Sequence, residues 1–505
     1  MPNNIGFDNE KYLSEQTAAI NERVTRFSDK LYLEFGGKLL FDFHASRVLP
    51  GFDPNVKMRL LQGLSDKAEV ILCIYAGDIE KKKMRADFGI TYDVDALKLI
   101  DDLADRGVPV TAVVITRYEE QPAAAAFKAQ LENRGVRVHT HRFTRGYPTD
   151  VDVVVSDQGY GANSYVETEK PIVVITGPGP GSGKLATCLS QLYHDHRRGL
   201  KSGYAKFETF PIWNLPLKHP VNSAYEAATA EMKDVNQIDH FHLEAYNERT
   251  VNYNRDIEAF PLLKRIIEKI TGGESFYESP TDMGVNRAGF GIVDDDIVKD
   301  AGAQEIVRRY FRYGCEHTMG LVDRDSVERI ELLMNNLDLN PESRIVVGPA
   351  REAAKRAELD GMGNDGIYCG AAMELPDGSI LSGYNSPQLH AAASLVLTCA
   401  KHLAGFSPEQ NLLPLDVIKS ISYLKKDVLG RKRVSLDAEE TLIALGISAA
   451  TDSAAKAAVA QLEKFRGCEV HMTHMPSPGD EAGLRKLGVN LTTEPRFASR
   501  RLFPS

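Results

Sequence analysis

One glycine-rich stretch constrains the fold of this chain more than any other feature. Five aliphatic or β-branched residues, Ile172 to Thr176, precede the run GPGPGSGK at 177–184, and a helical pattern follows from Leu185 to Asp195. Strand, glycine-rich loop, lysine and helix form the layout of a phosphate-binding loop, in which backbone N–H groups, the helix N-terminus and the lysine face an anion. The stretch therefore predicts an α/β sheet with a phosphate site after a buried parallel strand.

The run departs from the common nucleotide-binding pattern G-x-x-x-x-G-K-[ST] at two positions. Pro178 stands where that pattern has its first glycine, and Leu185 stands where it has the hydroxyl that holds Mg²⁺. Two interpretations stay open, a loop that binds a phosphate and a strand-to-helix turn without a ligand. We favour phosphate binding, and the residues expected to contact the phosphate or its cofactor are Gly177, Gly179, Gly181, Ser182, Gly183, Lys184 and Thr187.

The residues before this loop alternate between apolar runs and amphipathic helical patterns, with glycines at helix ends. This alternation predicts a doubly wound, mostly parallel sheet. The expected helices are 10–27, 54–67, 93–107 and 122–134, and the expected strands are 31–35, 39–43, 69–75, 108–116, 136–142 and 151–155. We expect an α/β domain with the glycine-rich phosphate loop over 1–250, a mainly helical domain over 251–338 and a C-terminal α/β domain over 339–505.

The C-terminal domain is expected to begin with a strand at 344–347 and to contain a β-hairpin and a long helix. Residues 367–375 and 379–384 flank the turn signal Pro376-Asp377-Gly378, and a helix is expected at 387–404. This order resembles the α-β-α layout of cytidine deaminases, which hold zinc with a cysteine pair. The chain has no such pair, so we expect no zinc.

The segment after the glycine loop is dense in Lys, His, Asn, Asp and Arg side chains, which predicts a polar site near the phosphate. Each histidine taken singly also fits a structural, hydrogen-bonded role. For a metal we consider Asp239, His242 and Glu244, of which His242 and Glu244 are alternate residues that would share one face of a strand. The catalytic candidates are Lys184, His219, Arg255 and Asp256, and the substrate-binding candidates are Lys218, Asn222, Asn254, Thr281, Asp282 and Asn286.

The net charge and the cysteine pattern limit the classes of partner and the cellular compartment that we expect for the chain. A net charge of −10 argues against general nucleic-acid binding, which normally needs a basic excess. The six cysteines show no short spacing, as is typical of reduced thiols in the cytosol. No signal-peptide pattern and no run of 18 apolar residues is present. We therefore expect a cytoplasmic protein with no nucleic-acid or membrane partner, and a homo-oligomer stays open.

Several sequence blocks together resemble a family. The chain contains GPGPGSGK, FETFPIWNLPLKHPVN, YEAATAE, FHLEAY, VNYNRD and SPTDMGVN. In this combination it is similar, over essentially its whole length, to an uncharacterised conserved bacterial protein family, a domain of unknown function with no assigned activity. The resemblance implies a cytosolic, multidomain α/β protein and leaves its reaction open.

The sequence thus favours an enzyme that binds a nucleotide or phosphorylated metabolite through the glycine loop, with phosphoryl or adenylyl transfer as the reaction. ATP and Mg²⁺ are the expected cofactors, and a small phosphorylated ligand is the expected partner. One alternative is an enzyme that acts on a phosphorylated metabolite without a nucleotide, which the missing hydroxyl at Leu185 favours. The other alternative is a ligand-binding regulator without catalysis.

Overall fold

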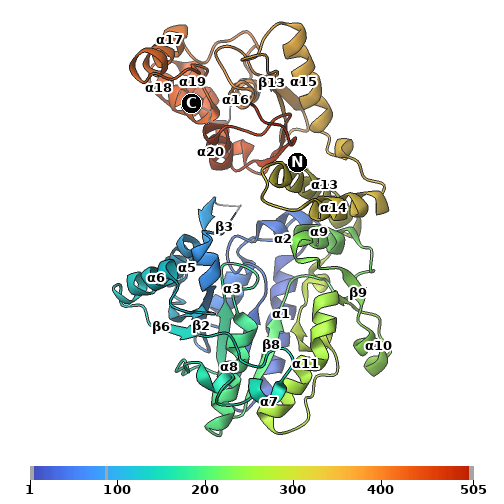
Figure 1. Cartoon of the computed structure of the whole chain (residues 1–505). Helices are drawn as coiled ribbons and strands as arrows, with labels where there is room; N and C mark the ends of the chain where they lie inside the picture. Colours follow the sequence, from blue (N-terminus) through green and yellow to red (C-terminus); the bar gives the residue numbers. More distant parts are fainter. Residues whose placement is uncertain (1–4, 86–88, 500–505) are drawn as a thin grey trace. The chain divides into compact units, whose positions relative to one another are not determined.

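The structure is a computed structural model that describes residues 5–85 and 89–499 (Figure 1). These residues form two compact units. The N-terminal unit contains residues 5–85, 89–226 and 234–302, and the C-terminal unit contains residues 227–233 and 303–499. The three-domain division with boundaries after residues 250 and 338 stays a prediction. Within the described ranges, no helix combines the length and the apolarity needed to cross a bilayer.

A seven-stranded parallel sheet forms the centre of the N-terminal unit, as the sequence predicted. Its strand order is β11-β8-β1-β7-β2-β5-β6, and every neighbouring pair is parallel. The aliphatic strand that precedes the glycine loop is β7, and all five of its residues are buried. The strands are β1 (Lys30–Phe35), β2 (Ala68–Tyr75), β5 (Val110–Thr116), β6 (Val138–His141), β7 (Ile172–Thr176), β8 (Ser202–Phe207) and β11 (Gly284–Val285).

Helices cover both faces of this sheet, because alternate strand residues point to opposite sides. One core joins Leu33, Leu72 and their neighbours to the helices on one face, and the other joins Ile71, Ile175 and their neighbours to the helices on the opposite face. Each fully buried aliphatic side chain contributes about 1.5–3 kcal/mol to folding. The helices of the first core are α1 (Asn9–Thr25), α3 (Val56–Gly63), α4 (Ala76–Glu80), α5 (Tyr92–Asp105) and α6 (Pro122–Glu132), and those of the second are α7 (Val151–Val154), α8 (Lys184–Arg197), α11 (Asn254–Thr271) and α12 (Pro280–Met283).

Shorter elements connect this framework. A small antiparallel ribbon pairs β9 with β10, and a second one pairs β3 with β4. The bounds are α2 (Phe43–Val48), α4 (Ala76–Glu80), β3 (Met84–Arg85), β4 (Ile90–Thr91), α9 (Pro220–Ala228), β9 (Asn236–Ile238), α10 (His240–Tyr246), β10 (Val251–Tyr253) and α12 (Pro280–Met283), with 3-10 turns at Tyr160–Ala162, Ala230–Met232 and Ala288–Gly291.

Two predicted strands of the N-terminal unit are wrong. Residues 39–43 do not form a strand, because Phe41 adopts a left-handed φ of 56° and Asp42 caps α2 by accepting the N–H of Ala45. Residues 151–155 form the short helix α7 instead, since Asp150 caps it at the N–H of Val153. Capping side chains therefore override the β-propensity of the apolar residues beside them.

The C-terminal unit is built on a four-stranded sheet with the order β13-β12-β14-β15. β12 (Gly370–Glu374) and β13 (Ile380–Tyr384) form the predicted hairpin, while β14 (Glu469–Met472) and β15 (Asn490–Thr493) are parallel. The resemblance to a deaminase layout stays a prediction. The helices are α13 (Asp295–Thr318, which begins in the N-terminal unit), α14 (Arg324–Asn336), α15 (Val347–Leu359), α16 (Ala391–Leu403), α17 (Leu415–Tyr423), α18 (Ala438–Ser448), α19 (Ser453–Val459) and α20 (Pro478–Leu487), with a π-helix at Leu424–Val428 and 3-10 turns at Pro341–Ser343 and Leu462–Phe465.

The strand predicted at 344–347 is absent, and the reason is a buried arginine. Arg344 is 1% exposed and donates to Glu469 at 2.5 Å and to the carbonyl of Val470 at 3.2 Å. This guanidinium anchors the segment against β14 through its side chain, and α15 begins at Val347. A charged group in a position that the apolar pattern assigns to a strand thus changes the local structure.

Candidate functional site

The glycine loop, residues 177–183, lies where the connections of the parallel sheet diverge. After β7 the chain passes β1 to reach β8, whereas after neighbouring β2 it runs the other way to β5. The helix that follows β7 packs on one face of the sheet, and the helix that precedes β5 packs on the other. Parallel α/β sheets bind their ligands in the crevice at such a point, beyond the carboxyl ends of the strands.

The backbone of the loop alternates between left-handed glycines and a residue with negative φ, a pattern that anion-binding nests also show. Gly181 and Gly183 have left-handed φ values of 73° and 90°, and the φ of Ser182 between them is negative. This alternation turns successive N–H groups toward one concavity. In the described part of the chain, no acceptor is found for the N–H groups of Gly179, Gly181 and Gly183. The loop therefore presents donors that a ligand can use.

Close packing explains the glycines at three of these positions. A Cβ atom at Gly177 would lie 2.5 Å from the carbonyl oxygen of Cys73, and one at Gly183 would lie 2.7 Å from the side chain of Thr116. At Gly179 it would lie 2.5 Å from the hydroxyl of Tyr92. Because backbone and packed side chains surround the loop, larger residues would displace it.

Neighbouring side chains hold the carbonyl groups of the loop. Thr116 donates its hydroxyl to Ser182 O at 2.8 Å, and Arg117 donates to Gly181 O. Lys184 folds back so that its Nζ lies 3.3 Å from Gly179 O and 3.4 Å from the hydroxyl of Ser182. With these carbonyls bonded to side chains, the N–H groups remain as the open face of the loop.

Lys184 is a cation without an acidic partner among the described residues. Lys184 is 9% exposed, and within the described residues its side chain forms hydrogen bonds only with the glycine loop. A buried ammonium that is not ion-paired favours an anion in its neighbourhood. Thr187, expected to contact the cofactor, is fully buried instead, with its hydroxyl 3.4 Å from Cys73 Sγ.

The structure adds residues from β2 and β5 that the sequence did not single out. The Arg117 guanidinium stacks 3.4 Å from the ring centroid of Tyr75. Burial raises the pKa of Asp78, although the charges of Lys83 and Arg117 oppose that rise. Tyr75 ends β2, Asp78 follows it, and Arg117 follows β5. The sequence offered only one signal that these residues could line a site, which was their position at the ends of predicted strands.

A second set of charges, the lysine cluster, lies at the ends of β8 and β1. Lys206 Nζ is 2.5 Å from both Glu208 Oε1 and Asp256 Oδ2. Glu34 lies beside Lys206 in the register of the sheet and accepts the hydroxyl of Tyr204 at 2.8 Å. Burial raises the pKa of Glu208 to about 7, the charge of Asp256 adds to the rise, and Lys206 opposes it. Of the residues predicted as catalytic, Asp256 is the one that belongs to this cluster.

Two predicted substrate-binding amides hold the backbone together. Asn222 is fully buried, accepts the N–H of Ile212 at 2.7 Å and donates to the carbonyl of the same residue at 3.0 Å. Asn286 donates to Pro211 O at 2.7 Å and accepts the N–H of Ala288 at 3.1 Å. Both amides are satisfied by the backbone, so the structure gives them a structural role.

His219 is held neutral by its surroundings. Its Nδ1 accepts the N–H of Val221 at 3.3 Å, so the proton lies on Nε2, which is 3.1 Å from Asp295 Oδ1. Burial lowers the pKa of His219, and the hydrogen bond to Asp295 only partly offsets this effect. Neighbouring Lys218 is exposed.

Four further candidates fix local turns. Arg255 pairs with Asp234 at 3.1 Å, and Asn254 accepts the N–H of Val235 at 2.9 Å. Thr281 donates to Asp239 at 2.7 Å, and Asp282 accepts the hydroxyl of Tyr246 at 2.6 Å. None of these contacts reaches the glycine loop.

The metal residues do not share a face, because their segment is not a strand. Asp239 caps helix α10 by accepting the N–H of His242 at 3.1 Å. His242 Nδ1 lies 2.8 Å from the hydroxyl of Ser279, and Glu244 is exposed. Across the described ranges, no group of three or more His, Cys, Asp or Glu side chains is arranged to hold a metal ion.

Two family models together match nearly the whole chain. Residues 5–338 match the family described as "Domain of unknown function DUF1846, N-terminal", and residues 342–503 match its C-terminal counterpart. A UPF0371 protein of Clostridium botulinum (strain Kyoto / Type A2) is 57% identical over 500 residues, which cover 99% of each chain. One of Clostridium tetani is 55% identical over 499 residues, again 99% of each chain. The chain therefore belongs to the DUF1846 family, whose bacterial relatives carry the name UPF0371.

Proposed function

We propose that the N-terminal unit is an enzyme domain that binds the phosphate of a nucleotide or phosphorylated metabolite in the glycine loop. The observation that supports this most is the combination of open N–H groups at Gly179, Gly181 and Gly183 with a lysine that has no acidic partner among the described residues. A phosphate offers several strong acceptor oxygens and one to two negative charges, which match these donors and this cation.

The roles of the side chains follow from their places along the sheet edge. Lys184 and Arg117 neutralise the charge that develops on a transferred phosphoryl or adenylyl group. Glu208, whose pKa is raised by burial, accepts the proton of the acceptor hydroxyl as the new O–P bond forms and the leaving group departs. β8 is two strands from β7, about 10 Å at the usual strand spacing, so an acceptor of metabolite size spans both groups.

A phosphorylated metabolite without a nucleotide is the second candidate ligand. The loop has Leu185 where nucleotide-binding loops carry the hydroxyl for Mg²⁺, and the hydroxyl of Thr187 faces Cys73 beneath the loop. The residues present therefore do not fit the usual Mg²⁺ position of such loops, which favours this candidate over ATP with Mg²⁺.

A thermal-shift screen separates these ligands. The full chain is heated with ATP, GTP, ADP, glucose 6-phosphate or fructose 6-phosphate, each with and without Mg²⁺. A ligand at 100 times its Kd adds about 2.7 kcal/mol of stability. We expect at least one ligand to stabilise the wild type and Lys201→Ala, an exposed lysine in the same unit, but not Lys184→Ala.

The set of ligands that raise the melting temperature then decides which class of protein this is. Stabilisation by a nucleoside triphosphate supports a transferase, and turnover of that ligand with an added acceptor completes the case. Stabilisation by a sugar phosphate alone supports the second candidate, and stabilisation without any turnover supports a ligand-binding regulator. No shift with any ligand, or an equal shift in Lys184→Ala, contradicts phosphate binding at the loop.

A further inference from the structure

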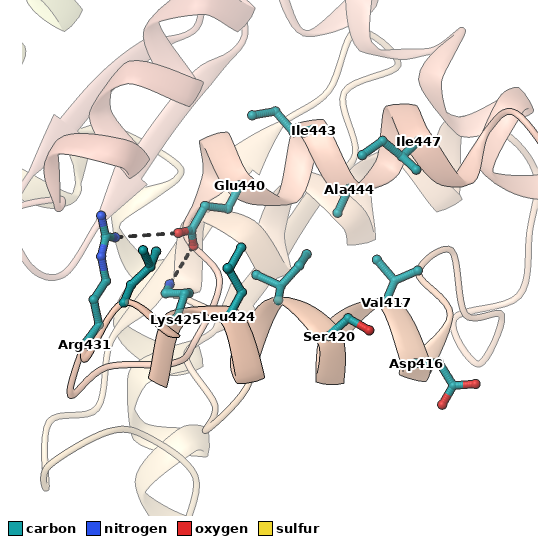
Figure 2. A pocket seen from close by; sticks show the side chains of 12 residues that line it. Asp416, Val417, Ser420, Leu424, Lys425, Arg431, Glu440, Ile443, Ala444 and Ile447 are labelled. Carbon is teal, nitrogen blue, oxygen red and sulfur yellow. Dashed lines mark hydrogen bonds and ion pairs between the residues drawn. The ribbon is translucent and has the colours of Figure 1, made fainter. Parts of the chain in front are cut away.

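The C-terminal unit contains an apolar groove of about 500 Å³ between two helices (Figure 2). One wall is α17 with the π-helix that continues it, and the other is α18. Val417 and Leu424 line the first wall, and Ile443 and Ile447 line the second. Binding sites for small molecules have this size and this mixture of many apolar and a few polar groups.

The side chains at this groove are unusually exposed for their type. Ile443 and Ile447 are 61% and 65% exposed, and Leu424 is 47% exposed. Covering apolar surface with an apolar ligand removes that surface from water, which favours binding. A contiguous exposed apolar surface often marks a binding site, whereas single exposed apolar residues scattered over a surface do not.

One end of the groove carries an excess positive charge. Glu440 accepts a hydrogen bond from Lys425 Nζ at 2.7 Å and forms a longer ion pair with Arg431 at 3.9 Å, so one carboxylate balances two cations (Figure 2). Lys425 is 8% exposed and also donates to the carbonyl of Ser435 at 2.6 Å. Arg431 is 55% exposed and its contact with Glu440 is long, so its guanidinium can donate to a further anion.

The opposite end of the groove has the opposite charge. Asp416 lines that end and is exposed, and no ion pair with it is found in the described part of the chain (Figure 2). An anionic group is therefore attracted to the Arg431 end and repelled from the Asp416 end. The groove thus selects the orientation of a charged ligand as well as its apolar part.

We propose that this groove binds a single-chain amphiphile with a carboxylate head, of the fatty-acid type. The chain lies between Val417, Leu424, Ile443 and Ile447, and the carboxylate meets Arg431. A helix of about 10 Å diameter fills about 420 Å³ per turn, so 500 Å³ holds little more than one turn of a partner helix. A small ligand with one charged end fits the volume and the charge better.

Calorimetric titration of the full chain with decanoate and with decyltrimethylammonium tests this proposal, because the two probes share a chain length and differ in charge. We expect saturable 1:1 binding of decanoate and at least tenfold weaker binding of the cation. Arg431→Gln is expected to weaken decanoate about tenfold and to bring the two probes closer. Ile447→Asp is expected to weaken both, whereas Leu359→Asp, a change at an 86% exposed leucine on α15, leaves both unchanged.

Three results overturn the proposal. One is the absence of saturable binding of decanoate below its micelle concentration by a wild type whose circular dichroism shows it folded. Another is equal affinity for the two probes with no effect of Arg431→Gln. The third is a wild-type dimer in light scattering that Ile447→Asp splits while decanoate has no effect, since a second copy then covers the groove. Lys184→Ala must bind decanoate normally, which keeps this test independent of the glycine loop.

Discussion

The glycine loop and the polar segment from 218 to 286 differ in how far their hydrogen-bonding groups are satisfied. The polar segment contains more chemically versatile side chains, yet Asn222, His219 and Asp239 all bond to backbone or side chains of their own unit. The loop contains few such side chains, but its N–H groups at Gly181 and Gly183 have no acceptor among the described residues. Open donors, rather than a high density of polar residues, mark the better candidate site.

Two lysines at the same sheet edge show this difference most clearly. Lys206 is held by two carboxylates at 2.5 Å each, whereas Lys184 contacts only loop oxygens. The first lysine balances charge within the fold, and the second is available to an external anion. The two should therefore respond differently to removal, one through stability and the other through binding.

The largest stability effect is expected for Lys206→Ala. Its loss leaves Glu208 and Asp256 close together and partly buried without their cation, which costs about 3 kcal/mol. Urea unfolding of the variant measures this loss. The double variant Lys206→Ala/Asp256→Ala should recover part of it, because one of the two repelling carboxylates is gone, and a double variant less stable than the single one would contradict the cluster.

A somewhat smaller loss is expected for Asn222→Ala. The change leaves the N–H of buried Ile212 without its partner and removes one of the two hydrogen bonds to the Ile212 carbonyl, at a cost of about 2 kcal/mol. Urea unfolding again gives the value, and a ligand found in the thermal-shift screen should still stabilise the variant by the same increment as the wild type. A variant of normal stability that the ligand no longer stabilises would contradict the structural role and would support a role of Asn222 in substrate binding.

A change in pH should reveal the neutral state of His219. Its pKa is lowered in the folded protein by burial, so the unfolded chain binds more protons below pH 6.5. Its contribution is complete above pH 6.5 and is lost as pH falls toward its folded pKa. Unfolding free energies at pH 7 and pH 5 should differ less in His219→Gln than in the wild type, by a few tenths of 1 kcal/mol. An equal or steeper pH dependence in the variant would contradict this assignment.

Local sequence was sufficient to predict β7 and α8, because the aliphatic residues of the strand and the helix-forming residues after Lys184 follow one another without conflict. It failed where a capping carboxylate decides the structure, as at Asp150 before α7 and at Asp239 before α10. The sheet order could not be predicted, since β7 is inserted between β1 and β2 by tertiary pairing.

The candidate site was predictable only in part for the same reason. Lys184 follows directly from its motif, but Thr116 and Arg117 come to the loop through the pairing of β5 with β2. Glu34 and Lys206 become neighbours through the register of β1 and β8. A single sequence contains no signal for these contacts, which depend on segments more than 60 residues apart.

The most direct test of the comparison is a calorimetric titration of inorganic pyrophosphate into the wild type, Lys184→Ala and Lys218→Ala. Lys218 is an exposed lysine of the polar segment, so it is the matched control. We predict saturable binding to the wild type and to Lys218→Ala, and at least tenfold weaker binding to Lys184→Ala, with all three proteins folded by circular dichroism. Equal binding by the wild type and Lys184→Ala, or a loss of binding in Lys218→Ala alone, would contradict the assignment of the anion site to the glycine loop.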